Sequence, residues 1–405
     1  MKTIVAVAVF AAFSAANAQT PPAGDAPPWK QGMNPEQSQS TLHPFAPHMT
    51  GRSAKELPLD KLHAPAGFKV EVWAEGIPEA RSLALGDKGT VFVSNRLSKN
   101  VYAVVDKGGN REVKTVLKGL NAPNGIVFSK GTLFVAERDK ITRYDGIEGN
   151  LDNPPAAKVV VENLDPTKQA GHFWKYLAMG PDGKLYFNIG APGNIVMPNY
   201  MQASVMRVDP ANGKLETVAL GVRNSVGMAF DPKTKDLWFT NHARDWLGDD
   251  SPNDTLHHVS LKAKAVPNFG YPFCHQGDTQ DPEFGKDRSC KEFTKPALKL
   301  GTHIAPLGVK FYTGKMFPAE YQGNMFIAMH GSWNRTVKQG YNIMRVTLDG
   351  KGQPKMQPFI TGFLTDEKAD PPMWGRPVDL LVMKDGSMLF SDDYNGILYR
   401  VSYSK

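Results

Sequence analysis

The stretch that decides the fold is residues 222–254, VRNSVGMAFDPKTKDLWFTNHARDWLGDDSPND. Two apolar runs, Val226–Phe230 and Leu237–Thr240, flank a segment rich in turn residues, a pattern that predicts an antiparallel hairpin. An Arg223-Asn224 pair opens the stretch and an acidic loop closes it. These residues alone fit either a solvated loop or a site that holds a metal and an anion.

The same hairpin pattern recurs along the chain. The copies are Ser82–Ser94, Gly125–Ala136, Tyr176–Asn188, Val226–Thr240, Leu307–Met329 and Val378–Ser391. Most copies are followed by a third alternating strand and several by a fourth. Four strands repeated radially form the blade of a β-propeller, so the repeats predict six blades.

The two ends of the repeat array complement each other. The last copy ends after its third strand, at Lys405, while a spare strand, Phe68–Ala74, precedes the first copy. Pairing the spare strand with the last blade would cover both exposed edges. We therefore predict an all-β fold over residues 61–405: a six-bladed β-propeller of four-stranded blades, with the ring closed by the N-terminal strand pairing with the last blade.

The N-terminus has the pattern of an export signal. Lys2 precedes an apolar run from Ile4 to Ala16, and small residues follow, so residues 1–18 predict a signal peptide cleaved near Ala18 and a periplasmic protein. Residues 19–60 are rich in Pro, Gln, Ser and His, which predicts a flexible linker. No later stretch is apolar for long enough to predict a transmembrane segment.

Charge and cysteine content narrow the class of partner. The formal charge of +7 is spread along the 405 residues with no basic run, which argues against a nucleic-acid partner and favours a small anionic ligand. The two cysteines, Cys274 and Cys290, predict a disulfide in an oxidising compartment.

In a propeller, the residues that lead into the innermost strands meet at one mouth of the ring. Here they are Arg81, Asn124, His172, Arg223, Asn224 and Arg376. Long loops, including 190–204, 241–254 and 329–340, lie on the same face, where binding and catalysis usually sit.

These side chains suggest a base and an anion site. A neutral His172 could remove a hydroxyl proton, although a lone histidine is more often structural. Arg223 and Arg376, with Arg81 or Arg335, could grip a ligand with several carboxylates, unless they pair with acids such as Asp379. The loop 241–254 offers oxygen ligands for calcium without the spacing of an EF-hand.

Several motifs, in order along residues 60–405, carry a family resemblance. They are LNAPNG (120–125), GH (171–172), VRNSVG (222–227), RDWLGDD (244–250), NFGYPFC (268–274) and GSWNR (331–335). The chain resembles the glucose/sorbosone dehydrogenase family, and within it the L-sorbosone dehydrogenase-like branch. The resemblance implies a six-bladed propeller that holds pyrroloquinoline quinone (PQQ) at one mouth, with calcium bound to the cofactor.

The resemblance also implies roles for individual residues. It places the general base at His172 and the residues beside cofactor and substrate at Arg223 and Asn224. Calcium ligands would be the backbone carbonyls of Ala243 and Arg244, and Asp254, which matches a family acid, belongs to the same metal site. The cofactor-binding residues would be Asn124, Arg223, Asn224, Arg335, Lys338 and Arg376. The chain departs from the glucose enzymes at Val378, where they carry a second arginine.

The sequence therefore predicts a periplasmic PQQ-dependent dehydrogenase that oxidises an aldose or a sugar-derived aldehyde similar to L-sorbosone. Electrons would pass to a separate acceptor, a cytochrome or a quinone, because the chain carries no haem attachment motif. A calcium-dependent propeller lactonase or a secreted binding module is the alternative, since propellers host many functions.

Overall fold

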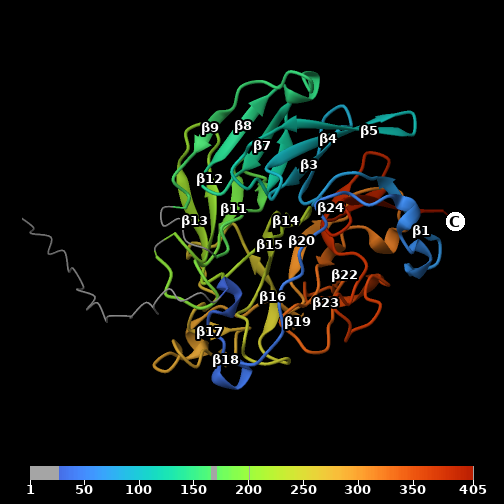
Figure 1. The fold of residues 1–405 in the computed structure, drawn as a ribbon. Helices are drawn as coiled ribbons and strands as arrows, with labels where there is room; N and C mark the ends of the chain where they lie inside the picture. Colours follow the sequence, from blue (N-terminus) through green and yellow to red (C-terminus); the bar gives the residue numbers. More distant parts are fainter. Residues whose placement is uncertain (1–26, 166–170, 200, 405) are drawn as a thin grey trace, which may run out of the picture.

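The structure, a computed structural model, describes residues 27–165, 171–199 and 201–404. The expected signal peptide, residues 1–18, lies outside these ranges. The strands form six four-stranded antiparallel sheets, arranged as blades around a central axis (Figure 1). This confirms the prediction of an all-β, six-bladed propeller.

The first three blades follow the chain without interruption. Their strands are β2 (Leu83–Leu85), β3 (Val91–Asn95), β4 (Asn100–Lys107) and β5 (Asn110–Leu117); β6 (Ile126–Ser129), β7 (Thr132–Ala136), β8 (Ile141–Asp145) and β9 (Lys158–Val161); and β10 (Leu177–Met179), β11 (Leu185–Ile189), β12 (Ser204–Val208) and β13 (Leu215–Leu220).

The last three blades depart from simple succession at two places. Their strands are β14 (Met228–Phe230), β15 (Leu237–Asn241), β16 (Asn253–Val259) and β19 (Leu298–Thr302); β20 (Pro306–Phe311), β21 (Met325–Met329), β22 (Asn342–Leu348) and β23 (Pro354–Ile360); and β24 (Pro377–Val382), β25 (Met388–Asp392), β26 (Ile397–Tyr403) and β1 (Phe68–Ala74). The blade of β14 contains an insertion, and the blade of β24 takes its fourth strand from the N-terminal side.

Short 3-10 turns accompany the strands. They are η1 (Pro28–Lys30), η2 (Pro35–Gln37), η3 (Ala54–Glu56), η4 (Leu59–Lys61), η5 (Ile147–Gly149), η6 (Cys290–Glu292) and η7 (Ala319–Tyr321).

The blades pack face to face through their second strands. Every residue of β3, β7, β11, β21 and β25 is buried, because each of these strands is covered by neighbouring blades on both sides. The outer strand β9 keeps its first two residues exposed. A buried strand needs apolar or hydrogen-bonded side chains at consecutive positions, as the run Leu185–Ile189 (LYFNI) illustrates.

The innermost strands contact one another in the order β2, β6, β10, β14, β20 and β24, and β24 also contacts β2. Asp379, on β24, links separate blades at this level. Its carboxylate accepts hydrogen bonds from Leu83 N at 2.9 Å and from the Tyr176 hydroxyl at 3.0 Å. Asp379 therefore has a structural role between blades and does not pair with Arg376.

Strand β1 has the bounds expected for the spare strand, and it pairs antiparallel with β26. Phe68 anchors it, with ring centroids 4.8 Å from Phe317, 5.0 Å from Phe359 and 5.0 Å from Tyr403. Edge-to-face aromatic pairs of this kind add about 0.5–1.5 kcal/mol each beyond the area they bury. The last blade therefore joins strands from both ends of the described chain.

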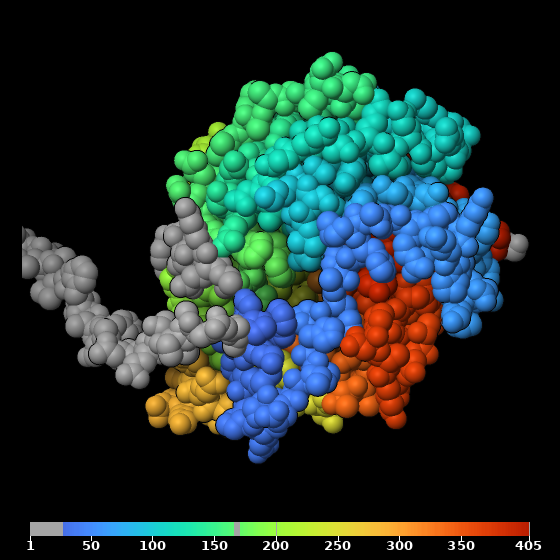
Figure 2. Space-filling view, viewed as in Figure 1, coloured from blue at the N-terminus to red at the C-terminus, as the bar shows by residue number. Residues whose placement is uncertain are grey.

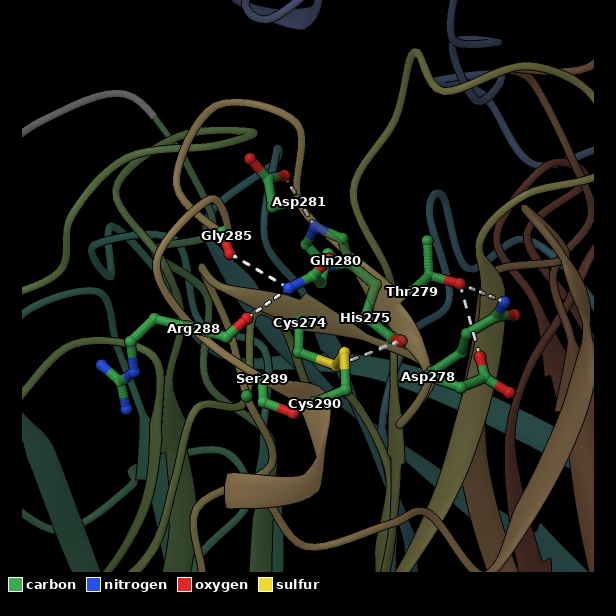
Figure 3. Close-up of a disulfide and its surroundings, with 12 residues drawn as sticks. Cys274, His275, Asp278, Thr279, Gln280, Asp281, Gly285, Arg288, Ser289 and Cys290 are labelled. Carbon is green, nitrogen blue, oxygen red and sulfur yellow. Dashed lines mark hydrogen bonds and ion pairs between the residues drawn. A yellow bond between two sulfur atoms is a disulfide. The ribbon is translucent and has the colours of Figure 1, made fainter.

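The fourth blade contains an insertion, residues 260–297, between β16 and β19. It carries a small hairpin, β17 (Cys274–His275) and β18 (Thr279–Gln280), and a disulfide joins Cys274 to Cys290 (Figure 3). The disulfide confirms the sequence prediction. The insertion places the fourth strand of this blade far beyond the position that the repeat pattern indicates.

The segment before β1 differs from the expectation of a flexible linker. Residues 27–60 lie against the propeller, and the part coloured dark blue in Figure 2 crosses the front face beside a hollow at the centre of the ring. Backbone hydrogen bonds from His48 N to Tyr394 O (3.1 Å) and from Arg52 N to Asn395 O (2.8 Å) tie it to the last blade. These bonds use main-chain groups, so composition gives little sign of them.

Helices that could cross a bilayer were sought among the described residues, and none is both long and apolar enough.

The innermost strands approach so closely that a side chain is excluded at Gly227. A Cβ there would lie 1.9 Å from the Leu307 carbonyl oxygen of the next blade. We predict that Gly227→Ala lowers the free energy of unfolding by about 1–3 kcal/mol or more. Gly350→Ala is the matched control, because among the described residues only its chain neighbours lie within 4 Å of its Cβ position. Equal denaturation midpoints for the two variants would contradict this packing.

Candidate active site at the mouth of the propeller

A buried carboxylate, Asp393, joins three side chains at the mouth. Arg81 Nη1 donates to its Oδ2 at 3.0 Å and Arg376 Nε to its Oδ1 at 3.0 Å, while His330 Nε2 lies 3.0 Å from Oδ1. Burial opposes the charge of Asp393, but Arg376, His330 and Arg81 together hold its pKa well below the usual range. Burial lowers the pKa of His330 to about 4. Two guanidinium groups thus share one carboxylate, which leaves an excess of positive charge.

The same cluster reaches the second blade. Arg81 Nε donates to Asn124 Oδ1 at 3.3 Å, and Asn124 Nδ2 donates to the Lys175 carbonyl at 3.0 Å. Three of the predicted mouth residues, Arg81, Asn124 and Arg376, are therefore brought together.

His172 lies on the other side of the mouth and is partly exposed. Its Nδ1 lies 3.1 Å from the Ala191 carbonyl oxygen. A carbonyl only accepts, so Nδ1 carries the hydrogen and Nε2 is the basic atom of the neutral ring. Burial and the positive charge of Arg223 lower the pKa of His172 well below 6.5, which keeps the imidazole neutral near pH 7.

Arg223 is fixed by two neighbours. Its Nε and Nη2 donate to the Asn194 backbone oxygen and Oδ1, both at 2.8 Å, and Nη2 also donates to Asp245 Oδ2 at 2.9 Å. Asn194 Oδ1 accepts in addition from Asp245 N at 2.7 Å. The guanidinium is therefore held rigidly, near enough to His172 for its charge to lower the pKa of that imidazole, and Asp245 balances part of the charge.

Asn224 presents an oxygen that lacks a donor. His242 Nε2 lies 2.9 Å from the Pro306 carbonyl, so Nε2 carries the hydrogen and Nδ1 accepts. Nδ1 in turn lies 3.2 Å from Asn224 Nδ2, which fixes the orientation of the amide. Asn224 Oδ1 is then buried with no donor among the described residues.

The proposed calcium ligands lie in the turn after β15. Asp254 Oδ1 accepts from Ala243 N and Oδ2 from Ala305 N, both at 2.8 Å. Burial raises the pKa of Asp254 to about 6. Both carboxylate oxygens thus bond to backbone amides, so Asp254 stabilises the turn by binding its backbone. No backbone N–H of the described residues donates to the carbonyl oxygen of Ala243 or Arg244.

The side chain of Arg244 points away from the mouth into the disulfide-closed insertion. Its Nη1 donates to Asp281 at 2.6 Å and its Nη2 to Glu283 at 2.9 Å. His275 Nε2 lies 2.8 Å from the same carboxylate of Asp281, next to the disulfide (Figure 3). These bonds anchor the backbone of Arg244 and hence its carbonyl.

Arg335 and Lys338 lie on the loop after β21 and hold it in shape. Arg335 donates to the Val337 carbonyl at 2.7 Å and to Asp250 at 3.0 Å. Lys338 Nζ donates to the Trp333 carbonyl at 3.0 Å and also to the Arg335 carbonyl, and burial lowers its pKa. Among the described residues, no three or more His, Cys, Asp or Glu side chains gather in a way that could hold a metal.

Several residues of this cluster were not among the predicted site residues. They are Asn194, His242, Asp245, His330 and Asp393. Three of them share one position, because His242, His330 and Asp393 directly follow the second strands β15, β21 and β25. That position faces the mouth, so the residue after each second strand is a further indicator of the site within the repeat pattern.

Comparison with known proteins places the chain in a family. The family model described as TrAA12-like matches residues 62–404. This chain belongs to the TrAA12-like family. An uncharacterised protein of Borreliella burgdorferi is 32% identical, with 85% of this chain and 91% of that protein covered.

Three further matches, one relative and two solved structures, are described more fully. A PQQ-dependent pyranose dehydrogenase of Coprinopsis cinerea is 25% identical over 71% of this chain, which spans 45% of that protein. The solved PQQ domain of the pyranose dehydrogenase of the same organism has a TM-score of 0.72 at 19% identity, with 84% of this chain and 97% of that domain covered. The calcium structure of the Trichoderma reesei family AA12 enzyme has a TM-score of 0.73 at 21% identity, with 85% and 97% covered. The resemblance to PQQ-dependent sugar dehydrogenases is confirmed, while the L-sorbosone dehydrogenase-like branch stays a prediction.

The side chains at the mouth fit an anionic quinone with calcium. The shared carboxylate of Asp393 leaves positive charge at Arg81 and Arg376 for a ligand with carboxylates. The carbonyl oxygens of Ala243 and Arg244, which accept from no backbone N–H of the described residues, are hard ligands of the kind that calcium prefers.

Buried histidines at and near the site predict acid sensitivity. The pKa is lowered by burial to about 3 in His242, to about 3 in His257 and to about 4 in His330. Because these pKa values are depressed in the folded state, their contribution to stability is full above about pH 6.5 and is lost as pH falls toward 4. Asp254 and Asp392, whose pKa values burial raises to about 6, act in the opposite direction.

We therefore predict that the free energy of unfolding, measured by denaturant titration, falls between pH 6.5 and 4. A constant or rising value over this range would contradict the neutral, buried state of the three histidines.

Proposed function

We propose that this chain is a PQQ-dependent dehydrogenase that oxidises an aldose or a sugar-derived aldehyde similar to L-sorbosone in the periplasm. The observation that carries the proposal is His172: a neutral imidazole with Nε2 as its basic atom, close enough to Arg223 for that charge to lower its pKa. The relatives described as PQQ-dependent pyranose dehydrogenases support the same reaction class.

Different residues of the mouth would bind PQQ and calcium. Arg376 and Arg81, held by Asp393, and Arg223, held by Asn194, would bind the carboxylates of PQQ. The backbone carbonyls of Ala243 and Arg244 would bind calcium, with Asp254 fixing the turn. Asn124, Asn224, Arg335 and Lys338 complete the proposed cofactor-binding set.

Oxidation of a hemiacetal or an aldehyde hydrate removes a proton from oxygen and a hydride from carbon. His172 Nε2 accepts the hydroxyl proton, because Nδ1 is fixed by Ala191 and the lowered pKa keeps Nε2 free. PQQ, when bound, supplies a quinone carbon that takes the hydride. Arg223 places a fixed positive charge near the atoms on which negative charge develops. The electrons then leave to a separate acceptor, a cytochrome or a quinone.

The general base is tested by His172→Ala. We predict that turnover of the PQQ-loaded enzyme falls at least about a hundredfold, since general bases contribute about 10²–10⁴-fold. PQQ affinity and the thermal midpoint should change little, because other residues hold the cofactor. His258→Ala is the control, since that histidine is on the outer part of β16 and bonds to Asp236. Normal turnover in a well-folded His172→Ala enzyme would exclude His172 as the base.

The metal is tested by chelation. We predict that removing divalent ions abolishes dye-linked activity and that calcium with PQQ restores it. Magnesium should restore less, because it demands shorter bonds and near-ideal octahedral geometry, which a turn built around two backbone carbonyls does not favour. Full activity in a metal-free preparation would rule out the calcium role of Ala243 and Arg244.

A further inference from the structure

The segment before the propeller takes part in the mouth. Residues 29–45, which we name the N-terminal strap, cross the face of the ring between the loops of the third and fourth blades and those of the fifth and sixth (Figure 2). The family match begins at residue 62, so the strap lies outside the part of the chain that defines the family.

One end of the strap bonds to residues that build the calcium turn. The carbonyl of Trp29 accepts from Trp246 Nε1 at 2.5 Å, and the carbonyl of Gly32 accepts from Arg244 Nη2 at 3.0 Å. Arg244 is one of the two residues whose carbonyls are proposed to bind calcium. The strap therefore completes the set of acceptors that fixes this residue.

The same end also acts on Arg223 through Asn194. Gln31 accepts from Asn194 twice, from N to Oε1 at 2.7 Å and from Nδ2 to the backbone oxygen at 2.8 Å. The strap and the Asp245 carbonyl, 3.1 Å from Nδ2, both hold the amide nitrogen of Asn194, so Oδ1 turns toward Arg223. The orientation of Arg223 thus depends on the strap through one intermediate residue.

The other end bonds to the second arginine of the site. Arg376 Nη1 donates to the Phe45 carbonyl at 2.7 Å, while Nε remains on Asp393. Lys338 Nζ lies 6.0 Å from the centroid of the Phe45 ring, and the ring packs against the aromatic core of the last two blades. A hydrogen bond between His43 Nε2 and Asp370 at 3.1 Å adds a further attachment.

Close approach at two glycines shows how tightly the strap fits. A Cβ at Gly193 would lie 2.1 Å from Gln31 Oε1. Gly32 has a φ of +70°, and a Cβ there would lie 2.8 Å from Ile195 Cγ2 and 3.0 Å from Arg244 Nη2. The strap and the mouth are therefore matched at the level of single side-chain atoms.

We propose that the N-terminal strap is a positioning element of the cofactor site that slows the release of PQQ. Its carbonyls hold Arg376 and Arg244 directly and Arg223 through Asn194, so the groups that grip the cofactor are fixed before it binds. Fixing binding groups in advance reduces the ordering that binding requires, and such gains are expressed mainly in the dissociation rate. The inference rests on the proposed function, because it needs PQQ as the ligand.

The test compares two glycine substitutions in the full chain. Gly32→Ala forces a clash with the mouth. Gly119→Ala has nearly the same φ, +71°, and among the described residues only its chain neighbours lie within 4 Å of the added Cβ. Each protein is loaded with PQQ and calcium, and release of PQQ is followed by ultrafiltration at timed intervals. We expect release from Gly32→Ala to be at least about tenfold faster than from the unaltered chain, and release from Gly119→Ala to stay within about twofold.

The thermal midpoint of each apo-protein separates positioning from general destabilisation. Equal release rates for the two variants, or slower release from Gly32→Ala, would overturn the inference while leaving the proposed function intact. Failure of the unaltered chain to bind PQQ would overturn the proposed function and the inference with it.

Should Gly32→Ala fail to fold, Gln31→Ala provides a milder variant. It removes only the Oε1 acceptor of Asn194 N and keeps the backbone of the strap. Its release of PQQ should be about threefold faster than that of the unaltered chain, by loss of one hydrogen bond. An unchanged rate of PQQ release from Gln31→Ala would contradict the positioning role of the strap.

Discussion

The chemistry of the mouth depends on one buried carboxylate, Asp393, that serves two guanidinium groups. Breaking a buried ion pair by removing one partner costs about 3–5 kcal/mol, so Arg81 and Arg376 can be buried here only while Asp393 stays charged. The same arrangement couples the first blade to the last, 312 residues apart in sequence. Because one negative charge faces two positive ones, the mouth stays attractive to an anion after its internal bonds are made.

Around this carboxylate, the long loops between strands orient the functional side chains. The loop containing Asn194 fixes Arg223, the disulfide-closed insertion holds the side chain of Arg244, and Asp254 secures the turn between them. The short, fully buried strands provide the rigid frame, and the loops place the functional groups. Because the strands form the frame and the loops carry the functional groups, a strand pattern repeated six times can support a single asymmetric site.

The sequence predicts the strands well where local pattern decides them. Phe68–Ala74 was identified with its observed bounds because alternating apolar residues define a strand without reference to the rest of the chain. Strand β19 was not predicted, because the insertion separates it in sequence from the other strands of its blade. The contacts of the strap were not predicted, because backbone carbonyls make most of its hydrogen bonds. The partnership of Arg81 with Asp393 escaped for a different reason: it joins distant positions, which no local pattern reveals.

The claim that this mouth holds an anionic quinone is tested most directly by titrating PQQ into the purified metal-free chain, with and without calcium, and following tryptophan fluorescence. The account predicts saturable binding of one PQQ per chain that calcium strengthens and added salt weakens, because guanidinium groups and a metal ion provide the attraction. Absence of binding in the presence of calcium, or binding indifferent to both calcium and salt, would contradict it.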